Sequence, residues 1–213
     1  MKLLIDNDFL LKMVAFGLLN RVLEFFGVSE SDVRVLPTAR YKFLLKSPEK
    51  GRQKYGPIFD QLSEAIERFT VLEDVDQAFS DKLAGVVGLD PGEVQLLAGL
   101  AKDQSALFLT GDKRCIRAVR ELDDPDVLAA LSGRVWCLEV MLGHLILSVG
   151  FEEVRACVVP NKAYDKTVRA VFGSGLQANR RAVAEALESY TRDIHNDAGD
   201  LLAGWPLPSL VEP

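Results

Sequence analysis

The sequence predicts an α/β fold in which a mostly parallel central sheet is flanked by helices. Three short apolar runs, residues 2–5, 106–110 and 134–138, have the character of buried strands. Helical patterns separate these runs, and such alternation is typical of a parallel sheet. The clearest helix begins at Asp90-Pro91-Gly92-Glu93, which places Asp at the N-cap, Pro at N1 and Glu at N3.

The amino-terminal half should contain two strands and several helices. Residues 2–5 form the first strand, and residues 9–26 form a mostly apolar helical segment that should be well buried. A second strand at 32–36 is stopped by Pro37. The remaining segments are a short helix at 38–46, a loop rich in Pro, Gly and charge at 47–57, and helices at 58–69 and 75–87.

The later elements repeat this order. The helix that Asp90 caps carries apolar residues at i, i+3, i+4 and i+7, which are Val94, Leu97, Ala98 and Ala101. We expect it to be followed by the strand 106–110, a helix at 113–121, one or two turns at 126–131, the strand 134–138 and a helix at 139–149.

The character of the sequence changes after about residue 150. Residues 179–194 form an amphipathic helical pattern, and the tail 205–213 contains three prolines and should be irregular. We therefore expect a domain of residues 1–150 and a helical C-terminal appendage of residues 151–213. The appendage should pack on the domain instead of building a second core.

The composition excludes several chemistries. The chain has 213 residues, a net charge of −6 and 48% hydrophobic residues, enough for a buried core. The chain has only two His, and its three Cys form no CxxC pair, which argues against a zinc ribbon. It also lacks the GxSxG, GxxxxGK(S/T) and GxGxxG patterns, which argues against Ser-His-Asp hydrolysis, P-loop hydrolysis and binding of Rossmann cofactors, respectively. The odd cysteine count and the lack of a visible signal peptide or membrane-spanning stretch predict a cytoplasmic protein without membrane association.

Carboxylates are the remaining candidates for chemistry. Asp6 and Asp112 each follow a predicted strand directly, where α/β folds place active sites, and Glu93 lies in the first turn of the helix that precedes the second of these strands. Adjacent parallel strands are about 4.8 Å apart, so these acids could face one small site, and Asp8 could add an oxygen. Gathered carboxylates repel one another, and a hard cation with oxygen ligands relieves this, which predicts Mg²⁺ or Mn²⁺ bound by Asp6, Asp8, Glu93 and Asp112.

Each acid also has a purely structural interpretation. Glu93 could be only the N3 partner of a capping box, and Asp112 and Asp8 only N-caps. Asp6 is harder to explain in this way, because a carboxylate that ends an apolar strand needs a partner. The combination of acids therefore carries more weight than any single one.

Three segments of the chain resemble the motifs of PIN-domain nucleases over roughly residues 1–150. Leu4-Ile5-Asp6-Asn7-Asp8-Phe9-Leu10 is similar to their first motif, an apolar strand that ends in Asp. Leu89-Asp90-Pro91-Gly92-Glu93-Val94-Gln95-Leu96-Leu97-Ala98 is similar to the middle motif, a GE pair that opens an apolar helix. Phe108-Leu109-Thr110-Gly111-Asp112-Lys113-Arg114 is similar to the third, a strand that ends in Thr-x-Asp.

This resemblance implies a PIN-like three-layer fold and metal-dependent cleavage of RNA, often by toxin ribonucleases. It implies Asp6, Glu93 and Asp112 as the catalytic, metal-binding acids, an antitoxin-like protein partner and frequent formation of homodimers. The chain departs from the family pattern at Gly111, where many relatives carry a second acid. Asp8 or Asp103 could compensate for it.

Two basic clusters are candidates for binding RNA phosphates, although the chain as a whole is acidic. The first cluster contains Arg40, Lys42, Lys46, Lys50, Arg52 and Lys54. Tyr41, Phe43 and Tyr55 are interleaved with it and could stack on bases. The second cluster begins directly after Asp112 with Lys113 and Arg114. Both clusters could equally be ordinary solvated surface.

Two other functions compete with a nuclease. In a haloacid-dehalogenase-like phosphatase, Asp6 and Asp8 would be nucleophile and general acid, and Thr110 would be the hydroxyl at a strand end, but Glu93 would have no role. A PIN-like scaffold that binds a partner and has lost catalysis is the alternative that is not an enzyme.

Overall fold

The computed structural model describes residues 1–44 and 47–210, and it contains a five-stranded, all-parallel sheet. The strands are β1 Leu3–Ile5, β2 Val33–Val35, β3 Thr70–Val71, β4 Leu107–Thr110 and β5 Val135–Cys137. Their order is β3-β2-β1-β4-β5, so β1 lies in the centre, between β2 and β4. Leu3 is paired with Val33 on one side and with Leu107 on the other. The predicted α/β class with a parallel sheet is confirmed.

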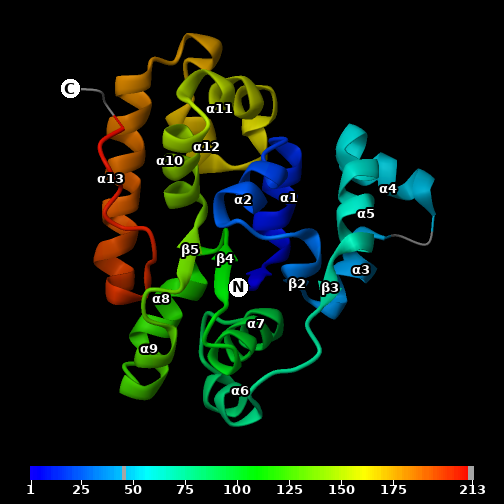
Figure 1. Cartoon of the computed structure of the whole chain (residues 1–213), viewed down its shortest axis with the longest axis vertical. Helices are drawn as coiled ribbons and strands as arrows, with labels where there is room; N and C mark the ends of the chain where they lie inside the picture. Colours follow the sequence, from blue (N-terminus) through cyan, green and yellow to red (C-terminus); the bar gives the residue numbers. More distant parts are fainter. Residues whose placement is uncertain (45–46, 211–213) are drawn as a thin grey trace.

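Helices flank this sheet and form the C-terminal part of the described chain (Figure 1). The α-helices are α1 Asn7–Ala15, α2 Leu19–Phe26, α3 Pro37–Phe43, α4 Pro48–Tyr55, α5 Phe59–Arg68, α6 Gln77–Leu83, α7 Pro91–Lys102, α8 Lys113–Glu121, α9 Pro125–Leu131, α10 Leu138–Ser148, α11 Phe151–Val158, α12 Lys166–Val171 and α13 Arg180–Ala198. Short 3₁₀ turns complete the connections, among them η1 Glu30–Asp32, η3 Val159–Tyr164 and η5 Gly199–Leu201. Helix α7 packs on β1 and β4, and α10 packs on β5 and α2.

The structure corrects two predicted elements in the first half of the chain. Residues 9–26 are not one helix but α1 and α2, because Gly17 adopts a left-handed conformation with φ +67° between them. Residues 47–57 are not a loop, since α4 occupies most of this segment. Pro48 stands at the start of α4, where proline is favoured. A Cβ on Gly51 would lie 2.1 Å from the Phe59 ring, so this glycine lets α4 pack closely on α5.

The C-terminal segment shares the core of the sheet domain. One continuous cluster of buried side chains runs from Leu3 in β1 to Leu187 in α13. Beyond η5, the chain also pairs with the outer edge of β5, because Leu202 forms an isolated parallel bridge with Val135 and the Ala203 amide donates to the Val135 carbonyl at 2.8 Å. The division into residues 1–150 and an appendage of residues 151–213 stays a prediction.

Among the described residues, the structure contains no helix with the length and apolar character needed to cross a lipid bilayer.

Candidate active site

Asp6 is the first side chain beyond the end of β1, it is buried, and it is the N-cap of α1, a role that the sequence had suggested for Asp8. Its own amide donates to Leu109 O at 3.1 Å, which continues the pairing of β1 with β4 and sets Asp6 beside the end of β4. Its carboxylate accepts from Phe9 N at 2.5 Å, from Gly111 N at 3.0 Å and from the Thr110 hydroxyl. Burial outweighs these bonds and raises the pKa of Asp6 to about 6.

Asp112 follows the end of β4 and caps helix α8. Its carboxylate accepts from Arg114 N at 2.8 Å and forms an ion pair with the Arg114 guanidinium, Nη2 to Oδ2, at 2.6 Å. The hydrogen bond from Arg114 lowers the pKa of Asp112. Asp112 is thus the N-cap that the structural interpretation expected. It is also connected to Asp6 through Thr110, whose Oγ1 accepts from Asp112 N at 3.0 Å.

Glu93 lies in the first turn of α7 and is buried. It forms the expected capping box with Asp90, each side chain accepting from the other residue's amide at 2.8 Å. Burial raises the pKa of Glu93 to about 7, and the charges of Asp90, Asp112 and Asp6 act in the same direction. The capping interpretation is therefore correct but incomplete, because Glu93 also lies within electrostatic range of both other predicted acids.

Cys115 lies in the same negatively charged surroundings. Cys115, in the first turn of α8, is buried, and its thiol pKa is raised by burial and further by Glu93, Asp6 and Asp112. The three acids predicted as catalytic, from segments distant in the sequence, therefore share one electrostatic environment at the carboxyl edge of the sheet.

Asp8, the predicted fourth metal ligand, is held in an ion-pair triad with Lys12 and Asp165. Lys12 Nζ lies 2.5 Å from Asp8 Oδ2 and 2.8 Å from Asp165 Oδ2. Burial alone would lower the pKa of Lys12, but hydrogen bonds with Asp165 and Asp8 outweigh it and leave the pKa raised. This triad was not predicted, because nothing in the sequence near Lys12 points to Asp165.

The triad also explains Gly111, which stands where relatives of the resembled family carry an acid. A Cβ on Gly111 would lie 2.2 Å from Asp8 Oδ2, so a side chain at this position would displace the Asp8 carboxylate from Lys12. Asp103 cannot compensate for the missing acid, and that suggestion was wrong. Asp103 ends α7 and forms an ion pair at 2.9 Å with Lys2, which precedes β1, so it lies at the opposite, amino edge of the sheet.

Glu139 is a further acid at the carboxyl edge that the sequence analysis did not select. It lies two residues beyond the end of β5, is 2% exposed, and forms an ion pair with Lys113 Nζ at 2.5 Å. The signal was present in the sequence, because Glu139 follows a predicted strand as Asp6 and Asp112 do. Lys113 also donates to Thr167 at 3.1 Å, which connects α8 to the C-terminal segment.

The predicted RNA-binding residues differ in their surroundings. Five of them are exposed on α3 and α4, namely Arg40, Lys42, Lys50, Arg52 and Lys54, and Lys46 lies outside the described residues. Arg52 is paired with Asp60 at 2.9 Å. Lys113 and Arg114 are engaged with Glu139 and Asp112, respectively, although the Arg114 side chain remains 80% exposed.

The aromatic part of the RNA-binding prediction was largely wrong. Phe43 and Tyr55 are buried in the core, and the Tyr55 hydroxyl donates to the Lys42 carbonyl at 2.9 Å, so neither ring is presented to a base. They face inward because α3 and α4 use them to pack together, their ring centroids 5.6 Å apart. Tyr41 is exposed, as the prediction required.

The donor chemistry of the acids fits a hard divalent cation, since all are carboxylates and two of them have raised pKa values. They do not form a finished coordination sphere. Within residues 1–44 and 47–210, no group of three or more His, Cys, Asp or Glu side chains is arranged to hold a metal ion. Both Asp6 oxygens accept hydrogen bonds, and Asp112 is covered by Arg114. Binding would require the exposed Arg114 to turn away from Asp112.

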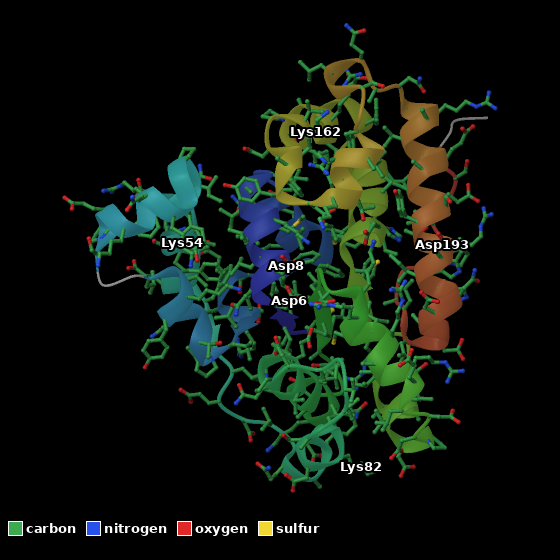
Figure 2. The ribbon with its side chains drawn as sticks, turned by 180° about the vertical axis from the view of Figure 1, so that it is seen from behind. Asp6, Asp8, Lys54, Lys82, Lys162 and Asp193 are labelled. Carbon is green, nitrogen blue, oxygen red and sulfur yellow. The ribbon has the colours of Figure 1, made fainter. Side chains whose placement is uncertain are left out.

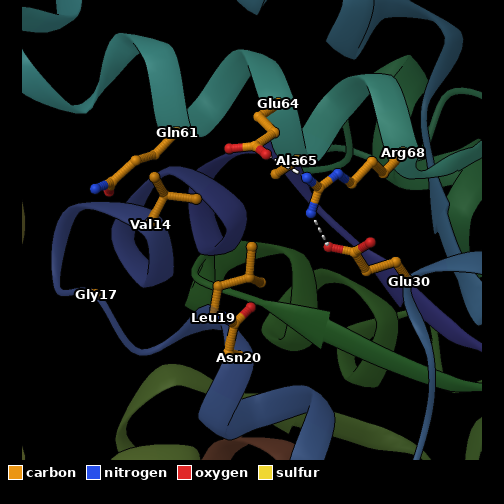
Figure 3. A pocket seen from close by; sticks show the side chains of 9 residues that line it. All are labelled: Val14, Gly17, Leu19, Asn20, Glu30, Gln61, Glu64, Ala65 and Arg68. Carbon is orange, nitrogen blue, oxygen red and sulfur yellow. Dashed lines mark hydrogen bonds and ion pairs between the residues drawn. The ribbon is translucent and has the colours of Figure 1, made fainter.

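A surface pocket of about 310 Å³ lies away from these acids (Figure 3). It is lined by the end of α1, the start of α2, η1 and α5, among them Gly17, Leu19 and Ala65. Arg68 reaches across its rim to Glu30, at 3.2 Å, and to Glu64. Because η1 leads into β2 and α5 leads into β3, this pocket lies at the amino edge of the sheet, where none of the predicted catalytic residues is found.

Searches with this chain against protein-family models, curated proteins and solved structures return no match.

Proposed function

We propose that this protein is a metal-dependent ribonuclease of the PIN-like type, with Asp6, Glu93 and Asp112 as its catalytic acids. The observation that carries the proposal is the position of these residues at one edge of the sheet, where Thr110 connects Asp6 to Asp112 through hydrogen bonds. Buried Glu93, in the first turn of α7, is close enough for both charges to raise its pKa. Capping alone accounts for Glu93 and Asp112 separately. Asp6 likewise caps α1, but capping does not require three carboxylates to gather, two of them buried, at the edge where parallel sheets build active sites.

Mg²⁺ or Mn²⁺ is the proposed cofactor, with Asp6, Glu93 and Asp112 as its ligands and Asp8 as a further candidate. When bound, such an ion lowers the pKa of a water molecule and neutralises the charge that develops on a phosphodiester. The protein's own contribution is orientation. Thr110 and the Gly111 amide fix the Asp6 carboxylate, and the Asp90 amide fixes that of Glu93.

RNA is the proposed substrate, and the exposed basic residues of α3 and α4 support this choice. Figure 2 shows Lys54 of α4 to one side of Asp6 and Asp8, which lie near the middle of the molecule. Arg114 combines an exposed side chain with direct contact to Asp112, so it could exchange this carboxylate for a phosphate. The antitoxin-like partner and the homodimer stay predictions from the resemblance.

The test compares wild type with Asp6→Asn, Glu93→Gln and Asp112→Asn on single-stranded RNA with Mn²⁺. We expect each substitution to reduce cleavage by about 100-fold or more, as loss of a group that stabilises transition-state charge typically does. Asp103→Asn is the matched control, an acid at the opposite edge of the sheet, and it should cleave RNA like wild type. Circular dichroism confirms that each variant is folded.

A chromogenic phosphate ester, assayed in parallel, separates the alternatives. Ester turnover that survives Glu93→Gln but not Asp6→Asn would replace the nuclease with the phosphatase. Absence of both activities in folded wild-type protein would leave the binding scaffold.

A further inference from the structure

Lys12 is a lysine buried beside the candidate active site, and the acids of the proposed reaction do not explain it. It lies on α1, one and a half turns after Asp6, and its side chain is 9% exposed. Removing an ammonium group from water is costly unless it is well paired. A methionine or leucine would fill the same space without this cost, so the charge itself requires an explanation.

The position of the ammonium connects it to the carboxylate site. A Cβ on Gly111 would lie 3.1 Å from Lys12 Nζ, and the amide of the same glycine donates to Asp6 Oδ2. The Lys12 ammonium and the Asp6 carboxylate thus lie on either side of one residue, in the turn between β4 and α8. A phosphate bound over this turn would be within reach of both.

The two partners of Lys12 differ in exposure. Asp165 is the N-cap of α12 and its side chain is 13% exposed, so it is fixed by the C-terminal segment. The Asp8 side chain is 48% exposed. Asp8 can therefore turn into solvent without disturbing the fold, whereas Asp165 cannot. Of the two anions paired with Lys12, Asp165 is therefore fixed, and Asp8 can be replaced by another anion.

We propose that Lys12 binds a non-bridging oxygen of the substrate phosphodiester, and that this phosphate takes the place of the Asp8 carboxylate while Asp165 continues to hold the ammonium. The inference rests on the proposed function, because it assigns the phosphate of that substrate to a residue of the same site. It also gives the C-terminal segment a role, since Asp165 positions Lys12 there.

The test measures RNA binding without cleavage. A fluorescein-labelled oligouridylate is titrated in EDTA at several salt concentrations, and its anisotropy is recorded. Lys12→Met should weaken binding by about tenfold and reduce the slope of log K against log salt by about 0.7, the value for one phosphate contact on a single strand. Lys12→Arg should restore most of the affinity. Asp8→Asn should tighten binding several-fold, because it removes the anion that the phosphate displaces.

The chain offers a matched control in a second triad of the same composition. Lys82 lies between Asp124, at 3.2 Å, and Asp126, at 3.3 Å. Figure 2 shows Lys82 at the lower end of the molecule, away from Asp8 near its middle. Lys82→Met and Asp126→Asn change the net charge as the test variants do, and each should alter the affinity by less than about twofold.

Three results would overturn the inference: Lys12→Met binding like Lys82→Met, Asp8→Asn binding no tighter than Asp126→Asn, or Asp8→Asn weakening binding as Lys12→Met does. The last result would make the triad merely structural. If Lys12→Met does not fold, the exposed Asp8→Asn and the charge-preserving Lys12→Arg still decide the question. The cleavage assay with Mn²⁺ is independent of this binding assay. Folded wild type that binds RNA through Lys12 but never cleaves it would refute the proposed function alone.

Discussion

Asp103, at the amino edge of the sheet, and Asp6 and Glu93, at the carboxyl edge, have pKa values shifted in opposite directions. At the amino edge, a hydrogen bond from Lys2 lowers the pKa of Asp103 to about 2. At the carboxyl edge, burial raises the pKa of Asp6 to about 6 and that of Glu93 to about 7. Asp103 is thus stabilised as a carboxylate by its ion pair, as Asp112 is by Arg114 at the other edge, whereas the buried Asp6 and Glu93 carry negative charge at a cost to the fold. Such a cost is typical of a functional site.

The largest expected effect is on stability at alkaline pH, and it comes from Glu93→Gln. A carboxyl group with a raised pKa in the folded state does not destabilise the fold below its unfolded value of 4.5 and penalises it increasingly as the pH rises through 7. Each pKa unit corresponds to about 1.4 kcal/mol, so Glu93→Gln should stabilise the protein by up to about 3 kcal/mol at pH 8. Urea denaturation at pH 4.5 and 8 measures this, and a substitution that destabilises at pH 8 would contradict it.

The next effect is stabilisation by a divalent cation. An ion that binds only the folded state raises the free energy of unfolding by about 2.7 kcal/mol at 100 times its dissociation constant. Mn²⁺ should therefore raise the melting temperature of wild type, and Glu93→Gln should lose most of this increase. Asp103→Asn, at the other edge, should keep it. An equal response of all three proteins would mean that Mn²⁺ binds elsewhere.

The smallest effect belongs to the amino edge and has the opposite sign. Asp103→Asn removes a partly exposed ion pair, which typically contributes up to about 1 kcal/mol. A carboxyl group with a lowered pKa stabilises the fold above its unfolded value of 3.8, and this contribution is lost as the pH falls through about 2. We therefore expect Asp103→Asn to destabilise the protein by about 1 kcal/mol at pH 7 and not at pH 2. Denaturation curves in which Asp103→Asn is more stable than wild type at pH 7 would contradict the prediction that Asp103 stabilises the fold.

Local patterns predicted the class of fold and most of its elements. The Asp90 capping box, the apolar runs of β1, β4 and β5, and the helix after Asp112 were all visible in short windows of sequence. The errors have local causes as well. The two-residue strand β3 is too short to produce a recognisable pattern. Gly51 contributed to the incorrect prediction of a loop, because its actual role, close packing against Phe59, depends on a different helix.

The candidate site was predictable only where a strand end marks it. Asp6 follows β1 directly and Asp112 lies two residues beyond β4, and the same rule would have found Glu139, two residues beyond β5. Lys12 and Asp165 follow no such rule, because they are separated by more than 150 residues and meet only through the packing of η3 and α12 on the domain. Whether a lysine in an apolar helix is buried depends on tertiary packing, so it cannot be predicted from a short window of sequence.

The bridge between Leu202 and Val135 has a consequence for how the chain is synthesised. On its outer edge, β5 pairs with Leu202 and Ala203, so this edge is covered only after these residues have been synthesised. Until then, a nascent chain that has already formed its sheet presents unpaired backbone groups on that edge, and open edges of this kind recruit strands from other molecules. Fragments that end before Gly199 should therefore aggregate more readily than the chain that includes residues 199–203.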